Sequence, residues 1–549
     1  MYVLAKKKDE KRWQVQIVES VRDGKSVRQK IVRNIGTAYS EKEISEFKRI
    51  GEAAIVEIKN AAKPVLSIFD PAEFHSPRKR QVPLSDEMVY PSNLKEEKRF
   101  NEGISDIFGK VYEDLGFDKL IQGTSKDREW NDILQSSVLA RIAEPDSKRA
   151  TSRFMDEEFD IRIPVQKIYR MMDLLSDIEG KIKQTVAQKT LAIFDQEVDV
   201  LFFDVTTLYF ESIERDELRN FGFSKDCKFN QSQVMLALVT THEGLPISYQ
   251  LFPGNTFEGH TLLHMVKELK ESFKVSQITL VADRGMFTRD NLEELEKHEI
   301  KYVVAAKLKS FSKAKKDEIL SSEFKATCVN NEFHWVRDFE NEGRRLVVSY
   351  SSSRAKKDAS DRQRLVDRLL KKVSPGKENI KIGDVISNSG TKKYLKINSG
   401  SAEIDFNKVE NDANWDGLHG VITNISEDHS AKILERYRGL WQIEEAFRVN
   451  KHSLKMRPIY HWSPRRIRSH ISLCYLTYAL AKHSVHRLKK KGLVISIDEM
   501  RHRLRRVEAS KIIDKPTQNR YVIPSATDKS QLEIYAAFDL ERSSTPYKI

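Results

Sequence analysis

Apolar and polar positions alternate along the first residues of the chain, as they do in strands with one buried face. The segments WQVQIVESV and SVRQKIVRNIG show this alternation on either side of Asp23-Gly24, a dipeptide typical of hairpin turns. Residues 1 to about 36 are therefore expected to form a small antiparallel meander. Ser40 stands in capping-box spacing with Glu43 and predicts a helix from Ser40 to about Asn60. Five prolines in residues 64–91 then predict a linker.

A helical pattern follows from about Lys95 to Phe194, as in ILQSSVLARIAEP and VQKIYRMMDLLSDIEGKI. It predicts a helical domain. Pro145, Asp146 and Ser147 interrupt the pattern, and the basic run SKRATSR comes next. Such a domain suits DNA binding or a spacer, and a purely structural bundle explains the same pattern almost as well.

Strands and helices alternate after residue 195, which is typical of an α/β layer. Strands are expected at 199–203, 233–240 and 245–252, in ITLVA and in YVVAA, with helices at about 259–273 and 289–298. Asp204 ends the strand LFFD, and Asp283 ends the strand LVAD. A carboxylate just past a buried strand lies at the sheet edge where open α/β folds build their sites. A single such Asp is commonly only a loop cap.

Between about Ser310 and Trp415 the segments are short and charged, as in LVVSYSSS, IKIGDV and KKYLKI. One helical stretch, from about Ala355 to Lys372, stands among them. The pattern predicts a mainly β module inserted into the α/β layer.

Composition is that of a soluble globular protein. The 549 residues exceed what one core supports and predict about three to four domains. Hydrophobic residues make up 39% of the chain, and no apolar run approaches the ~20 residues that span a bilayer. The start, MYVLAKKKDEKR, lacks the apolar core of a signal peptide, so we expect no membrane contact and a cytoplasmic location. Cys227, Cys328 and Cys474 are too dispersed for a disulfide framework or a zinc site.

The net charge of +13 is local. Residues 455–520 hold 17 Lys and Arg against 4 Asp and Glu, so the rest of the chain is neutral overall. Clustered cations of this kind suit a polyanion, and nucleic acid is the obvious candidate. A solvated basic tail is the alternative, but apolar residues interleave with the charges and favour folded helices.

The stretch from Tyr437 to Lys451, YRGLWQIEEAFRVNK, predicts a helix with functional groups that its packing does not require. Its apolar stripe consists of Leu440, Ile443, Phe447 and, more loosely, Trp441. Glu444 lies at the edge of this stripe, and Tyr437 and Lys451 are each about two turns away on the same side. An isolated Glu on such a helix is usually just a solvated charge.

Asp204 and Asp283 change the interpretation of Glu444. Three carboxylates converging at one sheet edge repel one another unless cations neutralise them. Oxygen ligands without His or Cys select Mg²⁺ or Mn²⁺. Two such ions activate an attacking water or 3′-hydroxyl and stabilise the departing oxygen of a phosphodiester. The three acids therefore predict phosphoryl transfer on nucleic acid.

The chain resembles DDE transposases of bacterial insertion sequences, in the IS-four-like group whose third-acid region reads Y-x2-R-x3-E-x6-K. Tyr437, Glu444 and Lys451 match this spacing, whereas Leu440 occupies the Arg position. Arg438 lies nearby but points elsewhere on the helix, so the Arg role is not transferred to it. Further segments of the resemblance cover most of the chain: FFDVTTLYFES, FGFSKD, LFPGNTFEGHTL, LVADRGM and HGVITN.

The resemblance implies an α/β fold with a ribonuclease H-like catalytic core, interrupted by a mainly β insertion between the second and third acids. It implies Mg²⁺-dependent cut-and-paste transposition, in which terminal inverted repeats are bound, cleaved and joined through their 3′-hydroxyls to target DNA. Asp204, Asp283 and Glu444 would hold two Mg²⁺ ions, which Mn²⁺ can replace. Glu445 is a weaker candidate because it faces about 100° around the helix.

The resemblance also implies contacts with double-stranded DNA and a homodimer on it, because two ends must meet; the protein would be nucleoid-associated when bound. Tyr437 and Lys451 would hold the DNA end. Further DNA contacts are expected from Arg448, Arg465, Arg466 and Arg468. Relatives that cut through a hairpin stack a flipped base on an aromatic ring, for which Trp335, Trp415 and Trp441 are candidates, although a core role is commoner for any one Trp.

The expected organisation has six parts. They are a β meander plus helix (1–63), a linker (64–94), a helical domain (95–194), the catalytic domain (195–309 and 416–485), the insertion (310–415) and a basic C-terminal region (486–549). Two other functions stay open. One is a ribonuclease H-like nuclease without strand transfer, which the insertion, Tyr437 and Lys451 disfavour. The other is an inactive DNA-binding relative, against which the intact acids argue.

Overall fold

The computed structural model describes residues 2–9, 12–23, 26–38, 44, 47–48, 89–194, 200–222, 230–256, 261–262, 264–268, 279–283, 289–329, 332–372, 391–398 and 401–549. All structural statements below concern these residues.

The N-terminal residues form the expected antiparallel meander. Strands β1 (Tyr2–Asp9), β2 (Arg12–Asp23) and β3 (Ser26–Ala38) pair in that order. β2 pairs with β3 up to Asp23 and Ser26, on either side of the predicted turn. The predicted helix from Ser40 to Asn60 and the linker up to residue 88 lie almost entirely outside the described residues.

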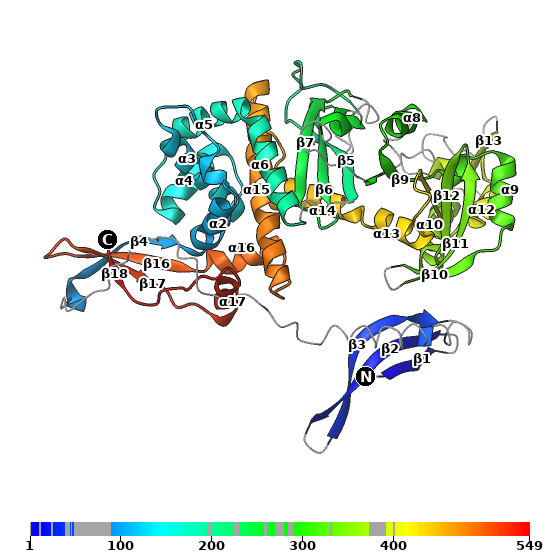
Figure 1. The fold of residues 1–549 in the computed structure, drawn as a ribbon, viewed down its shortest axis with the longest axis horizontal. Helices are drawn as coiled ribbons and strands as arrows, with labels where there is room; N and C mark the ends of the chain where they lie inside the picture. The colour runs from blue at the N-terminus through cyan, green and yellow to red at the C-terminus, as the bar shows by residue number, and fades with distance from the viewer. Residues whose placement is uncertain are drawn as a thin grey trace.

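A helical bundle follows, as the pattern predicted. It consists of α2 (Gly103–Asp114), α3 (Asp127–Ala143), α4 (Lys148–Phe159), α5 (Val165–Asp177) and α6 (Glu179–Ala192). A helix from far along the chain, α15 (Pro464–Lys490), runs through this bundle and buries most of its side chains there (Figure 1). Within the described ranges, no helix combines the length and apolar character that crossing a membrane requires.

The C-terminal strands form another sheet together with the early strand β4, in the order β18-β17-β16-β4. Its strands are β4 (Leu94–Asn101), β16 (Glu508–Asp514), β17 (Arg520–Pro524) and β18 (Tyr547–Lys548), accompanied by α16 (Ile497–Arg505) and α17 (Lys529–Ala537). The prediction of helix from Lys95 is wrong for β4. This strand owes its hydrogen bonds to β16, about four hundred residues further on, which no local pattern reveals.

The central sheet has the order β10-β11-β12-β15-β9-β8-β5-β6-β7 among the described strands. Its core strands are β5 (Val200–Tyr209), β6 (Gln233–Thr241), β7 (Pro246–Pro253), β8 (Thr279–Ala282), β9 (Lys301–Ala305) and β15 (Leu418–Thr423). β5, β8 and β9 are parallel, and the other pairings are antiparallel. The strands predicted from apolar runs are confirmed, as is the helix at 289–298, which is α8 (Arg289–Lys297).

The two faces of the central sheet belong to two cores. Phe202, Val281 and Val303 pack in one cluster with the helical bundle and α15. Phe203, Ala282 and neighbouring side chains form the other cluster, together with α8. The helical bundle and the sheet therefore share one continuous core.

The insertion differs from the mainly β module that was predicted. Strands β10 (Lys325–Val329), β11 (Glu332–Asn341) and β12 (Arg344–Tyr350) extend the central sheet through the pairing of β12 with β15. In the described part of residues 310–415, helices α9 (Lys313–Ser321), α10 (Ser352–Lys372) and α12 (Phe406–Ala413) hold more residues than the strands. Residues 313–321 and 406–413 are too few for a helical repeat of apolar positions to show in the sequence. The segment IKIGDV lies outside the described residues.

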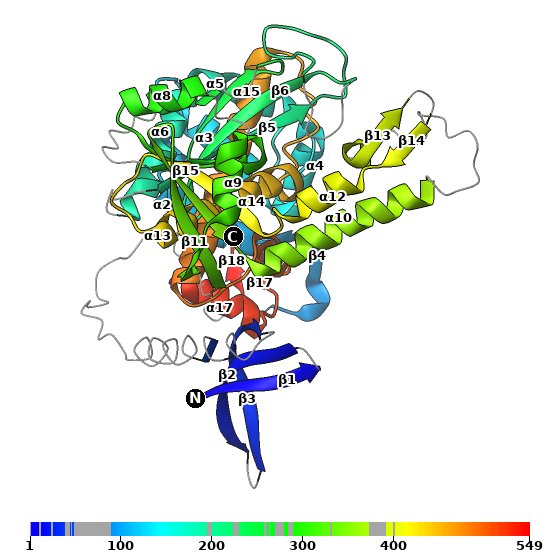
Figure 2. The same cartoon turned by 90° about the vertical axis from the view of Figure 1, so that its right-hand side faces the viewer.

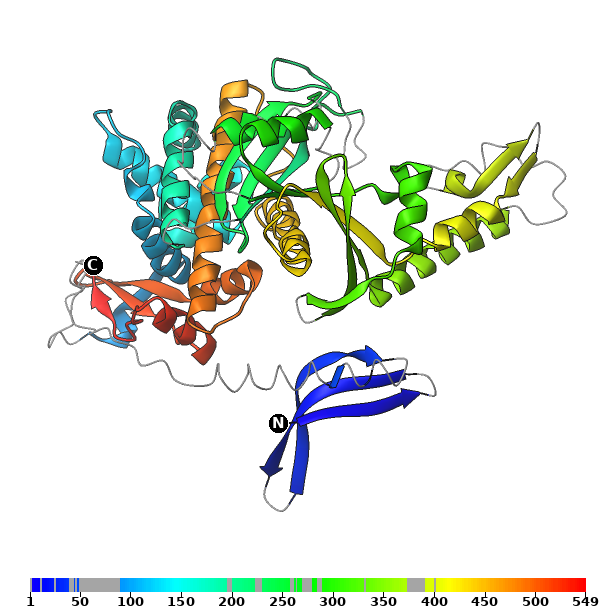
Figure 3. The ribbon, with the colours of Figure 1, turned by 45° about the vertical axis from the view of Figure 1, so that its right-hand side comes forward.

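Part of the insertion projects as an arm. α10, α12 and the hairpin β13 (Leu395–Asn398) and β14 (Ser401–Ile404) extend away from the rest of the molecule (Figures 2 and 3). The chain enters the insertion after β9 and returns from it into β15. The base of the arm lies next to this point of the sheet and forms one wall of the cavity described below.

Candidate active site

Asp204 and Asp283 lie on neighbouring parallel strands at the same level. The register pairs Phe203 with Ala282, so each aspartate is the next residue on its strand. Adjacent strands are about 4.8 Å apart. Asp283 follows the end of β8, as predicted, but Asp204 does not end β5. That prediction is wrong because antiparallel pairing with β6 continues to Tyr209, beyond the parallel pairing with β8.

Both aspartates share a face of the sheet with the helix that carries Glu444. Side chains alternate between faces along a strand, so Asp204 lies on the face of Phe202, and Asp283 on that of Val281. Phe202 and Val281 pack in the same core as Ile443 of α14 (Trp441–Arg448). The Val205 amide donates a hydrogen bond of 2.7 Å to Asp204 Oδ1.

The predicted single helix from Tyr437 to Lys451 is three segments. They are α13 (Ser430–Arg438), α14 and a π-helical turn, η6 (Val449–Ser453). The first break comes at Gly439, which approaches β5 so closely that a Cβ atom there would lie 2.4 Å from Phe202 Cζ. The spacing of apolar residues did not reveal this break because the stripe continues across it.

The residues of the predicted signature are distributed over these segments. Tyr437 is half-buried, and its ring centroid lies 4.9 Å from that of His419. Glu444 is exposed in the first turn of α14, and Lys451 is half-buried in η6. Leu440 is only 8% exposed and belongs to the core. An arginine at this position would place a charge among apolar side chains in this fold.

The donor set suits a hard divalent cation. Asp204, Asp283 and Glu444 offer carboxylate oxygens, the ligands that Mg²⁺ and Mn²⁺ prefer. Within the described ranges, however, no three His, Cys, Asp or Glu side chains stand close enough together to hold a metal ion. The two aspartates thus lie at one level on the face that α14 covers. In the described residues, Glu444 does not come close enough to them to complete a set of metal ligands.

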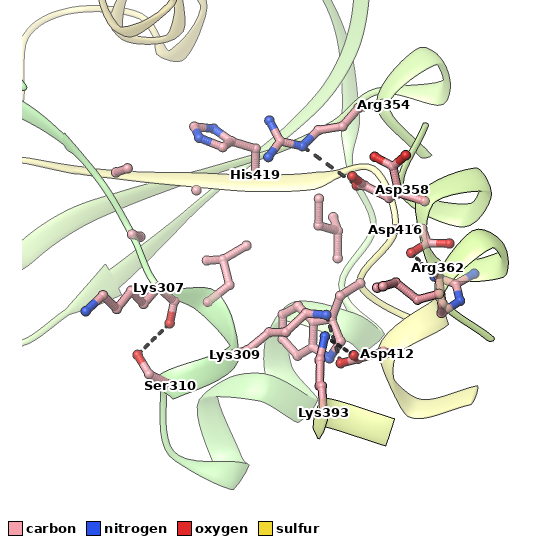
Figure 4. A pocket seen from close by; sticks show the side chains of 18 of the residues that line it. Lys307, Lys309, Ser310, Arg354, Asp358, Arg362, Lys393, Asp412, Asp416 and His419 are labelled. Carbon is pink, nitrogen blue, oxygen red and sulfur yellow. Dashed lines mark hydrogen bonds and ion pairs between the residues drawn. The ribbon is translucent and has the colours of Figure 1, made fainter. Parts of the chain in front are cut away.

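A cavity of about 840 Å³ opens beside Asp283. Asp283, Tyr437 and His419 line it from the side of the central sheet. Arg354, Asp358 and Arg362 of α10 and Asp412 of α12 line it from the insertion (Figure 4). The second acid and the predicted DNA-end tyrosine therefore face the same space. Sequence reasoning missed His419, although it stands in the segment HGVITN, because only the tertiary fold brings it against Tyr437.

The insertion wall of this cavity is held by an ionic network around Asp412. Lys309 Nζ lies 2.9 Å from Asp412 Oδ1, the Tyr394 hydroxyl donates at 2.8 Å to Oδ2, and Lys393 also contacts Oδ2 (Figure 4). Burial opposes ionisation of Asp412, but the hydrogen bonds from Lys393, Lys309 and Tyr394 outweigh it and lower its pKa to about 2. The wall is thus a fixed charged surface at neutral pH.

The arginines predicted to bind DNA have carboxylate neighbours. They pair as Arg448 with Glu445 (2.6 Å), Arg465 with Asp177 (2.7 Å), Arg466 with Asp173 (3.0 Å) and Arg468 with Glu179 (3.9 Å). Three of these pairs join the start of α15 to α5 and α6. The basicity seen in the sequence is thus partly neutralised by acids that are distant in the chain.

The candidate tryptophans differ in exposure. Trp441 is 58% exposed on α14. Trp415 is half-buried and lines the cavity beside Asp283. Trp335 is half-buried, with its ring centroid 5.8 Å from that of Tyr350. Two exposed rings were not considered from the sequence, Tyr460 and Trp462, and they lie on the segment between η6 and α15.

Two family models match the chain. The model described as "Transposase DDE domain" matches residues 196–480, more than half of the chain and all three predicted acids. The model described as "IS1634 family transposase, N-terminal domain" matches residues 3–61, which include the β meander. A comparison with curated proteins gave no match. The matches support transposition of an insertion sequence without extending to the IS-four-like group or its signature. The chain belongs to the DDE transposase family.

Proposed function

We propose that this transposase cleaves the terminal inverted repeats of an insertion sequence and transfers the freed 3′-hydroxyl ends to target DNA in a Mg²⁺-dependent reaction. The catalytic domain would be ribonuclease H-like. Asp204, Asp283 and Glu444 would hold the metal. Bound Mg²⁺ supplies activation of the attacking water or 3′-hydroxyl and stabilisation of the leaving oxygen.

One observation carries the proposal. Asp204 and Asp283 occupy equal levels on adjacent parallel strands, on the face covered by the helix that carries Glu444. Asp283 and Glu444 are exposed, so a cation and DNA can approach both carboxylates from solvent.

The other residues would position the DNA. The Val205 amide fixes the orientation of the Asp204 carboxylate. Tyr437, which lines the cavity beside Asp283, would contact the phosphate next to the scissile bond, and Lys451 would contact the DNA end. Arg448, Arg465, Arg466 and Arg468 would contact DNA phosphates in competition with their present carboxylate partners. A homodimer on DNA would bring the two ends together.

Conservative variants of Asp204, Glu444 and the neighbouring Glu445 test the proposal. Glu444→Gln and Asp204→Asn should reduce Mg²⁺-dependent cleavage of the DNA that flanks the coding region to background. Glu445→Gln should retain cleavage, because Glu445 pairs with Arg448 and not with the metal. Cleavage products on denaturing gels, with Mg²⁺ and with EDTA, provide the measurement, and gel shifts in EDTA should show unchanged DNA binding.

The outcome separates the proposal from its alternatives. Wild-type activity in Glu444→Gln contradicts the assignment of the third acid. Cleavage without joined products, when a target plasmid is added, indicates a nuclease without strand transfer. DNA binding without cleavage by the wild-type chain indicates an inactive relative.

A further inference from the structure

Residues 454–463, LKMRPIYHWS, connect η6 to α15 and are here named the strap. Ile459 is 2% exposed, Tyr460 is 63%, His461 is half-buried and Trp462 is 62% exposed. This alternation is that of extended chain, in which side chains two residues apart point the same way, about 7 Å from each other. The strap therefore presents two large aromatic rings on one open side.

The backbone of the strap is fixed to its surroundings. Its hydrogen bonds include Arg141 Nη2 to Lys455 O (2.8 Å), His470 Nε2 to Met456 O (3.0 Å), Met456 N to Asn450 O (2.9 Å) and Ile459 N to Tyr209 O (3.3 Å). Ile459 also forms a parallel bridge with Phe210. The two rings thus stand on a rigid support, so little conformational entropy is lost when something packs against them.

The strap lies past the far end of the strand that carries Asp204, because Ile459 pairs with Phe210, about 20 Å along the chain from Asp204. It crosses the chain just after β5, the strand that carries Asp204, and it follows directly on η6, which carries Lys451. A DNA strand that ran from the acids along β5 to its end would reach the strap.

The charge around the strap suits a polyanion. The sequence contains no Asp or Glu between Glu445 and Asp498, a stretch with 12 Lys and Arg, of which Arg465, Arg466 and Arg468 pair with acids of α5 and α6. Lys455 is exposed at the start of the strap, and the Arg219 guanidinium lies 5.9 Å from the centre of the Trp462 ring. Arg219 is buried and pairs with Asp216 at 2.7 Å and with Glu214 at 3.6 Å, so Lys455 rather than Arg219 is accessible to a phosphate. A nucleic acid strand can use both groups, because phosphates bind cations and bases stack on aromatic rings.

We propose that Tyr460 and Trp462 form a stacking platform for two successive unpaired bases of a DNA strand. The proposal rests on the proposed function insofar as DNA cleavage exposes such a strand near the acids. Lys455 contacts a phosphate, and the rings accept any base because every base has a π-face. The platform is separate from the tryptophans expected from the resemblance.

Binding of single-stranded and duplex probes to the full chain tests the platform. The probes are a fluorescein-labelled oligothymidylate and a blunt duplex of equal length, both in EDTA. Each base stacked on an aromatic ring contributes ~1–3 kcal/mol, so losing two of them in the Tyr460→Ala, Trp462→Ala double variant should weaken oligothymidylate binding by about 30-fold or more. Duplex binding should change by less than about twofold, and the Phe variants at both positions should bind both probes as the wild type does.

A second readout reports stacking directly. Two adjacent 2-aminopurines in the oligothymidylate should lose fluorescence when the wild-type chain binds and keep it in the double Ala variant at saturating protein. Tyr90→Ala, which removes a ring 61% exposed elsewhere in the chain, is the matched control and should change neither probe. Lys455→Ala should weaken both probes together, because it removes a phosphate contact.

Equal weakening of both probes in the double Ala variant, or none, overturns the platform. An unchanged melting temperature shows that the variant is folded, as expected for two exposed rings. Asp204→Asn should retain the quenching, since the assay contains no metal. Failure of the catalytic proposal and failure of the platform are therefore distinguishable.

Discussion

At the scale of single residues, Lys148 is unusual because its ammonium group is buried. It begins α4 and is only 4% exposed. Burial lowers its pKa from 10.5 to about 7, and repulsion from Arg141 adds to the effect. Above this pKa the native chain lacks a proton that the unfolded chain still binds, so stability should rise with pH between about 7 and 10.5.

Replacing Lys148 by Met should therefore stabilise the protein in a pH-dependent way. At pH 6 the variant should melt at a higher temperature than the wild type, because the buried charge is gone, and the difference should shrink toward pH 10. Thermal melts followed by circular dichroism provide the measurement. Lys126→Met, at an exposed position, is the control. A difference that stays constant with pH would show that only packing had changed.

At the scale of elements, the junction of α13 and α14 decides where Glu444 stands. Gly439 is pressed against Phe202, and only a residue without a Cβ atom fits there. Position 444 in α14 thus depends on a contact with β5, the strand of Asp204. Helix and strand must fit each other before the acids can meet.

Gly439→Ala should displace α14 and lose most cleavage activity while DNA binding persists. Overpacking of this kind costs about 1–3 kcal/mol. Adding Phe202→Leu to the variant should restore part of the stability and activity, because it makes room for the Cβ atom. Gly180→Ala, in a helix where nothing lies within 4 Å of the new Cβ, should leave cleavage intact and stabilise slightly. Full activity in Gly439→Ala would contradict the role of this contact.

At the scale of the whole molecule, α15 joins the helical bundle to the catalytic sheet. Its arginines pair with acids of α5 and α6, and its apolar side chains fill the shared core. These arginines can have one of two roles: they stabilise the contact between α15 and the bundle, or they bind DNA phosphates. Exposed ion pairs contribute only about 0–1 kcal/mol, so the apolar contacts rather than the charges hold α15 in the bundle.

Replacing Asp173 and Asp177 by Asn should distinguish these roles. If Arg465 and Arg466 bind phosphates, the double variant should bind duplex DNA several times more tightly at low salt, because the competing carboxylates are gone. Titrations at several salt concentrations provide the measurement. Unchanged DNA affinity with a lower melting temperature would assign the arginines to the interface between α15 and the bundle.

Local pattern alone predicted much of the catalytic region. The apolar runs gave β5 to β9, the position of Asp283 after β8, and the amphipathic segment with Glu444, because strand and helix periodicities are properties of neighbouring residues. The carboxylates without His or Cys predict a hard divalent cation, and this stays a prediction. These inferences needed no knowledge of which elements touch.

Contacts between distant segments decided the rest. Leu94–Asn101 became a strand because β16 pairs with it, and the strands of the insertion joined the central sheet through β15. Asp204 lies inside β5 because β6 pairs beyond it, and Leu440 is buried because α14 packs on the sheet. Sequence determined which segments are apolar, periodic and charged. Only the tertiary structure determined which of them meet, because hydrogen bonds and packing between residues hundreds of positions apart leave no local pattern.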